Sequence, residues 1–71
     1  MADRDSTAHR RAASMLDEAA RRHDWAARYW EEHGNPDLAA LERRFAINDR
    51  STASAERSLA RNQTEVPARR S

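Results

Sequence analysis

The chain has no cysteine, no lysine and a single glycine among its 71 residues. Without cysteine, neither a disulfide nor a thiolate-bound metal can staple a small core. No apolar run approaches the roughly 20 residues of a membrane span, and the N-terminus lacks the apolar segment of a secretory signal. These absences argue against a disulfide-rich mini-protein, a zinc finger and a membrane protein, and we expect a cytoplasmic location.

Large aliphatic side chains are also scarce. Leu, Ile, Val and Phe together number seven, and fifteen alanines supply much of the 38% apolar fraction. Thirteen arginines face twelve acids, so the net charge of +1 gives no strong basic field to hold nucleic acid. A composition rich in arginine and alanine but without lysine is typical of GC-rich coding, which suggests a bacterial or phage source.

The segment Gly34-Asn35-Pro36-Asp37 predicts a tight turn between two helices. Glycine just past a helix end adopts the left-handed conformation that closes the last turn. Asn35 is a good N-cap, Pro36 suits the first helical position, and Asp37 suits the positive end of the helix dipole. Two helices joined by so short a connection run antiparallel, so the sequence predicts an all-α, coiled-coil-like hairpin.

Capping and helix-breaking residues set the predicted helix limits, and the spacing of the apolar residues sets the predicted core. We expect a disordered start at residues 1–4, helices at about 5–33 and 36–63 around a turn at 34–35, and a polar tail at 64–71. The apolar positions step by four and three along both helices, as in coiled coils. The predicted hairpin core consists of Leu16, Ala19, His23, Ala26, Trp30, Leu38, Leu41, Phe45, Asn48 and Leu59.

Laying the two stripes side by side places His23 opposite Asn48 as a polar layer. If its surroundings are apolar, protonation of His23 makes the seam sensitive to pH, which is a second hypothesis for the same layer. An alternative breaks the second helix at residues 48–51, where Asp49 or Ser51 can cap a third helix.

Signatures of catalysis and of metal binding are missing. The sequence has no glycine-rich phosphate loop, no serine-centred elbow and no HExxH pair, so we expect no enzymatic activity, no metal and no cofactor. Three acid–arginine pairs at a spacing of four predict surface ion pairs within the first helix: Asp17 with Arg21, Glu18 with Arg22, and Asp24 with Arg28.

Three large apolar side chains lie off the predicted stripes: Trp25, Tyr29 and Ile47. Trp25 has Arg21, Arg22 and Arg28 as helical neighbours, so one hypothesis is a surface tryptophan lying under arginine stems. The favoured hypothesis is a protein-binding surface, because Trp, Tyr and Arg are enriched in binding hot spots. The predicted protein-binding residues are Arg21, Arg22, Trp25, Arg28, Tyr29 and Ile47.

A single hairpin of this size buries too little surface to offset its ordering cost. We therefore expect a non-enzymatic interaction module, whose hairpin pairs with a second copy into a four-helix bundle or docks on a larger protein. No membrane partner and no small-molecule substrate are expected.

Two alternative functions stay open. In one, a dimer pools arginines to bind nucleic-acid phosphates, namely Arg10, Arg11, Arg43, Arg44, Arg57, Arg61, Arg69 and Arg70. In the other, the acidic hairpin tip, with Glu31, Glu32 and Asp37, inserts into the channel of a larger enzyme.

Overall fold

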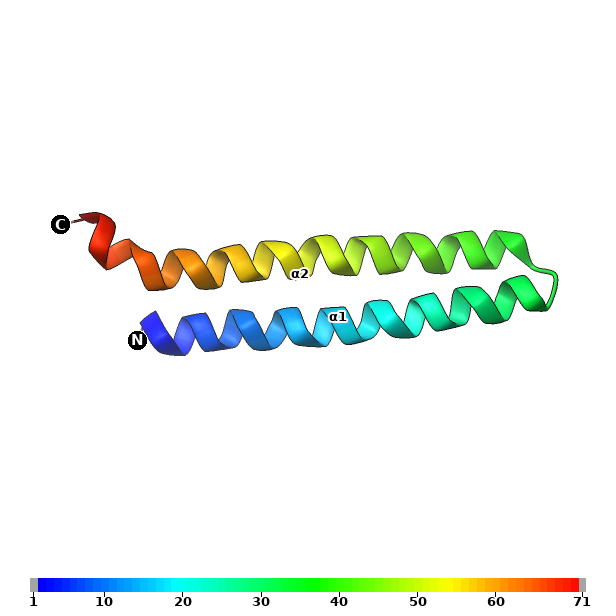
Figure 1. Cartoon of the computed structure of the whole chain (residues 1–71), viewed down its shortest axis with the longest axis horizontal. Helices are drawn as coiled ribbons and strands as arrows, with labels where there is room; N and C mark the ends of the chain where they lie inside the picture. The colour runs from blue at the N-terminus through cyan, green and yellow to red at the C-terminus, as the bar shows by residue number, and fades with distance from the viewer. Residues whose placement is uncertain (1, 71) are drawn as a thin grey trace.

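The computed structural model contains two long helices, α1 (Ala2–Glu32) and α2 (Pro36–Arg70). It describes the backbone of residues 2–70 and the side chains of residues 5–62. The helices run antiparallel and lie side by side along the whole length of α1, with both chain ends remote from the turn (Figure 1). The Cα atoms span 58 × 16 × 9 Å, so the molecule is a thin ribbon. The predicted all-α helical hairpin is confirmed.

The turn has the geometry that its sequence predicts. Gly34 has φ 74°, the left-handed conformation that glycine adopts without strain. Its N–H donates to the carbonyl of Glu31, and the N–H of Asn35 donates to that of Trp30 at 2.8 Å, which closes the end of α1 as a Schellman motif. The Asn35 side chain then accepts a hydrogen bond from the Leu38 N–H at 3.1 Å and caps α2.

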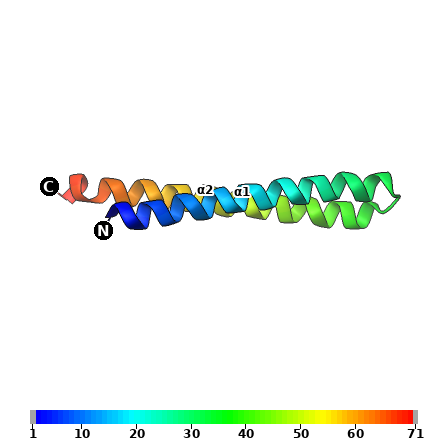
Figure 2. The same ribbon diagram turned by 90° about the horizontal axis from the view of Figure 1, so that it is seen from below.

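The seam between the helices is built from small residues spaced by seven. Within residues 5–62, the buried apolar side chains are all alanine, and one serine is buried with them: Ser6, Ala13, Ala20 and Ala27 on α1, and Ala39, Ala46, Ala53 and Ala60 on α2. A seven-residue repeat keeps one stripe facing the partner helix while the helices supercoil. The shallow crossing of α1 and α2 in Figure 2 agrees with this arrangement.

The predicted core therefore needs correction. Leu41, Phe45 and Leu59 are 40%, 42% and 43% exposed, and Asn48 is exposed as well. The other members of the predicted core are half-buried: Leu16, Ala19, His23, Ala26, Trp30 and Leu38. The physical reason is that the line of closest approach between two helices has room only for a methyl group, so larger side chains are displaced to its flanks.

The register also differs from the predicted one. Ser6 Oγ donates to the Ala60 carbonyl at 3.2 Å, and His23 Nδ1 lies 2.6 Å from Glu42 Oε1. His23 was predicted to face Asn48, which lies six residues further along α2. Two carboxylates of α2, Glu42 and Asp49, approach the His23 ring in place of Asn48, so the layer around His23 is charged as well as apolar, and the pH sensitivity of the seam stays a prediction.

α2 is continuous through residues 48–51, so the alternative with a third helix is wrong. The helix limits extend beyond the predicted ones at both chain ends. α1 begins at Ala2, within the segment expected to be a disordered start, and α2 continues to Arg70, through most of the segment expected to be a polar tail.

Candidate protein-binding surface

Two rows of polar contacts flank the alanine seam and give the ribbon two different faces. Residues four positions after a buried seam residue lie on one side of the seam, and residues three positions after it lie on the other side. The contacts between the helices agree with this geometry, because each row joins equivalent positions of α1 and α2.

The first row is a ladder of ion pairs in which α1 supplies the acids and α2 the arginines. Its rungs are Glu31 with Arg43, Asp24 with Arg50, and Asp17 with Arg57. The Glu31–Arg43 rung measures 2.6 Å between Oε2 and Nη2. We call the side of the ribbon with these six residues the charged face.

The middle rung shifts the protonation equilibria of its partners. The hydrogen bond that Arg50 donates to Asp24 holds the pKa of that carboxyl below its usual value, although partial burial opposes this effect. The same hydrogen bond raises the pKa of Arg50. The sequence predicted Asp17 and Asp24 to pair with Arg21 and Arg28 within α1; the structure instead pairs both acids across the helices, and only Glu18 with Arg22, at 3.9 Å, follows that prediction.

The second row pairs histidines of α1 with carboxylates of α2. His9 Nδ1 lies 2.6 Å from Glu56 Oε1, and His23 Nδ1 lies 2.6 Å from Glu42 Oε1. Asp49 is the second carboxylate beside His23, with its Oδ2 3.7 Å from Nε2. These contacts fix the register of the side of the ribbon that carries most of the large apolar residues.

The side of the ribbon with the histidine–carboxylate row is formed by residues that lie three positions after, or one position before, a buried seam residue. We call it the apolar face, and its apolar members are Leu16 and Trp30 with Ala12, Ala19 and Ala26 on α1, and Leu38, Phe45 and Leu59 on α2. Phe45 lies against the His23 ring, with 5.3 Å between ring centroids, which places both helices' contributions on one surface. Met15, Tyr29 and Leu41 extend its margins and are 64%, 41% and 40% exposed.

Of the predicted protein-binding residues, Trp25 and Ile47 lie away from the apolar face. They are 64% and 65% exposed, and Ile47 follows the buried Ala46, so its side chain lies toward the charged face. Trp25 stacks on Tyr29 with 6.1 Å between centroids, and Tyr29 in turn stacks on His33 at 4.0 Å. The three predicted arginines are all exposed: Arg21, Arg22 and Arg28. The structure thus gathers Trp25 and Tyr29 but does not gather the predicted set into one surface.

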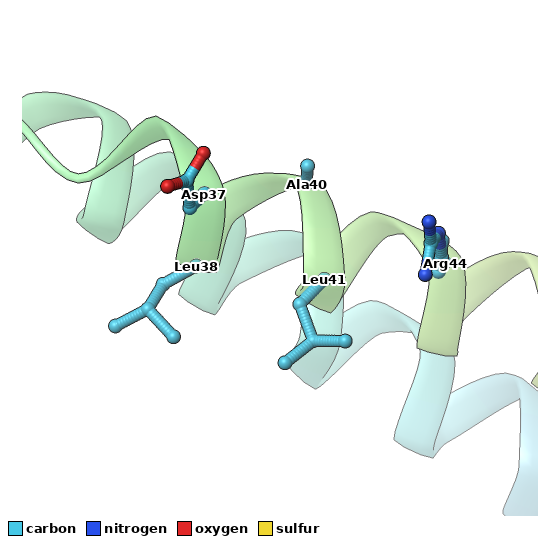
Figure 3. Close-up of a pocket in the computed structure, with 5 residues that line it drawn as sticks. All are labelled: Asp37, Leu38, Ala40, Leu41 and Arg44. Atoms are coloured by element: carbon cyan, nitrogen blue, oxygen red, sulfur yellow. The ribbon is translucent and has the colours of Figure 1, made fainter.

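A shallow hollow lies over the first turns of α2 and is lined by Asp37, Leu38, Ala40, Leu41 and Arg44. All five residues belong to one helix. Leu38 and Leu41 point to one side of α2 while Asp37, Ala40 and Arg44 point away from them (Figure 3). The hollow is therefore the outer surface of a helix and offers no convergent polar groups for a small ligand.

The acidic tip of the hairpin was predicted as an alternative functional element that inserts into the channel of a larger enzyme. In the part of the chain whose side chains are described, no group of three or more histidine or acidic residues is arranged to hold a metal ion. Glu31 contacts Arg43, and the His33 ring contacts the Tyr29 carbonyl at 2.8 Å. Over the same described segment, neither helix has the length and apolarity needed to cross a membrane.

Comparison with protein-family models, with curated proteins and with solved structures gives no match to this chain.

Proposed function

We propose that the chain is a non-enzymatic protein–protein interaction module and that its docking surface is the apolar face. The observation that carries this proposal is the segregation of side-chain size. Within residues 5–62, the helix seam holds only alanine and one serine, while Leu16, Trp30 and Phe45 lie outside it on one side of the ribbon.

The energetics of the seam support the proposal. The seven buried alanine methyl groups remove much less apolar surface from water than a core of leucine and phenylalanine side chains would. A partner that covers the large apolar side chains supplies the burial that the seam lacks, so folding and binding are coupled.

The opposite face does not offer such a surface. Its arginines Arg43, Arg50 and Arg57 are engaged with acids of α1, which also weakens the alternative of phosphate binding by pooled arginines. Two large apolar residues lie away from the apolar face. Ile47 is on the α2 side of the charged face, and Trp25 is on the outer edge of α1. Exposed apolar residues that do not join into one continuous patch are normal on protein surfaces.

Thermal unfolding followed by circular dichroism from about 1 to 300 μM protein tests the proposal. A melting temperature that rises with concentration shows association coupled to folding. A weakly helical monomer at every concentration indicates that the hairpin folds on a different protein. A fully helical monomer whose stability does not depend on concentration would contradict the proposal, because the apolar face would then be stable in water without a partner.

A further inference from the structure

The two helices contribute different chemistry to the apolar face. One position before each buried alanine, α1 carries the small residues Ala12, Ala19 and Ala26, whereas α2 carries Thr52 and the large residues Leu38, Phe45 and Leu59. Three positions after a seam residue, α1 carries His9 and His23 with Leu16 and Trp30 between and beyond them, and α2 carries Glu42, Asp49 and Glu56. Each helix therefore complements the other helix and not itself.

We propose that the occupant of the apolar face is a second copy of this chain, stacked with its turn at the same end. This inference rests on the proposed function and names the partner. In a same-end stack, the two-fold axis runs along the ribbon, and α1 of each copy lies on α2 of the other. In an opposite-end stack, the axis runs across the ribbon, so α1 lies on α1 and α2 on α2.

Side-chain size favours the same-end stack. The His9–Glu56 and His23–Glu42 contacts fix which residues lie at one level of the ribbon. At that register, Ala19 lies at nearly the same level as Phe45, Ala26 as Leu38, and Ala12 as Thr52, whereas Leu59 lies near the level of Ser6. Because same-end stacking puts these rows against each other, Phe45 and Leu38 each enter the space above an alanine, which is how packed layers interdigitate.

Charge favours the same arrangement. An opposite-end stack brings the α2 rows of two copies together, and with them six carboxylates: Glu42, Asp49 and Glu56 from each copy. Between residues 36 and 62, no cation of α2 lies in those rows. A same-end stack places His9 and His23 of one copy against the carboxylate row of the other. Asp49 lies 3.7 Å from His23 Nε2 of its own chain and, in this stack, also faces the histidines of the second copy. Like charges placed opposite one another disfavour an interface, and this discriminates between the two stacks.

The available area is sufficient for a stable dimer. The Cα ribbon is 16 Å wide, and α1 contains 31 residues, which at 1.5 Å per residue makes it about 46 Å long. The apolar side of the ribbon therefore presents roughly 700 Å² per copy, close to the approximately 800 Å² per partner of a standard interface.

Distance measurement between spin labels tests the orientation. Because the chain has no cysteine, Glu32→Cys, an exposed position at the end of α1, gives a single nitroxide site per copy. The same-end stack predicts a label separation below about 30 Å, within the width of a four-helix bundle. The opposite-end stack separates the two turns by roughly the length of the hairpin, about 45 Å. Dilution with unlabelled protein is the control, since it must reduce the dipolar signal of an intermolecular pair.

A separation near 45 Å in a dimer would overturn the same-end stack and leave the interaction function standing. A weakly helical monomer at 300 μM would overturn the second copy as the occupant, again without affecting the broader function. A stable helical monomer would overturn both.

Discussion

The aromatic ring of Phe45 lies against the imidazole of His23, with 5.3 Å between centroids and 52° between ring planes. His23 is held from the other helix by Glu42 at 2.6 Å. Phe45 therefore lies beside a fixed polar group on its inner side, while 42% of its surface remains exposed. This places a large aromatic side chain at the centre of the apolar face.

Substitution of Phe45 tests which face of the ribbon mediates self-association. Phe45→Glu places a charge in the apolar face and is expected to lower the affinity of self-association by at least tenfold, because the charge loses its hydration when the face is covered. Ile47→Glu, two residues away and 65% exposed toward the charged face, is the matched control and should change the affinity less than twofold. Sedimentation equilibrium measures both.

The result also discriminates between the two predicted surfaces. If Ile47→Glu lowers the affinity more than Phe45→Glu does, the assignment of the docking surface to the apolar face is wrong. The result would then favour the surface predicted from the sequence, which includes Trp25 and Ile47. Since Phe45 contacts His23 within the chain, Leu59→Glu provides a second variant that reports on the same face without that contact.

Enlarging the alanine seam should destabilise the hairpin. Ala46 is 1% exposed in the seam, so Ala46→Leu is expected to lower the free energy of unfolding by about 1–3 kcal/mol, as overpacking of a close-packed core does. Ala40→Leu, at an exposed position of the same helix that points away from Leu38 and Leu41, should stay within about 0.5 kcal/mol of the parent. Urea unfolding at fixed protein concentration gives both values. Equal effects at the two positions would mean that the seam does not lie along the seven-residue alanine repeat.

The Asp24–Arg50 hydrogen bond makes a contribution to stability that depends on pH. Arg50 holds the pKa of Asp24 below its unfolded value of about 3.8, so the contribution is present above that pH and is lost as the pH falls through the lower, folded pKa. Arg50→Gln should lower the melting temperature at pH 7, and the difference from the parent should shrink as the solution is acidified below pH 4.

Arg28→Gln is the control for this experiment, because Arg28 lies on the same helix as Asp24 and acts on its carboxyl only through a weaker electrostatic effect. A larger loss from Arg28→Gln than from Arg50→Gln would show that the ion pair within α1 dominates over the one between the helices.

The turn depends on the left-handed conformation of Gly34. A Cβ at this position meets no atom within 4 Å, so the cost of Gly34→Ala comes from the backbone at φ 74° and not from a clash. That conformation costs an L-residue about 1–2 kcal/mol. Gly34→Asn should cost less than Gly34→Ala, because asparagine tolerates the left-handed region better. Chemical unfolding of both variants checks the order, and the reverse order would contradict this origin of the effect.

The sequence predicts the turn well because its signals are local. Gly34, Asn35 and Pro36 act through backbone conformation and capping, which depend on immediate neighbours. The sequence also contains the seam, as an alanine at every seventh position from Ala39 to Ala60. Large side chains are the usual guide to a core, however, and they led to a predicted stripe on α2 that includes Leu38, Phe45 and Leu59, each one position before a buried alanine. Two helices alone have no interior wide enough for large residues, so that guide fails here.

The side chains that pair between the helices could not be predicted without the register. Once the seam is shifted, His23 meets Glu42 in place of Asn48, and Asp24 meets Arg50 in place of Arg28. The candidate surface moves with it. Tyr29 remains at the margin of the apolar face, whereas Trp25 and Ile47 lie away from it, because one residue of displacement turns a helix by about 100°.

The most direct test of the central claim uses the two tryptophans as reporters of different surfaces. Trp30 lies on the apolar face, and Trp25 is 64% exposed away from it. Acrylamide quenching is measured on Trp25→Phe, which retains Trp30, and on Trp30→Phe, which retains Trp25, over the concentration range in which the chain associates. The account predicts that Trp30 becomes protected as the concentration rises while Trp25 stays accessible. Protection of Trp25 with Trp30 unchanged would contradict it.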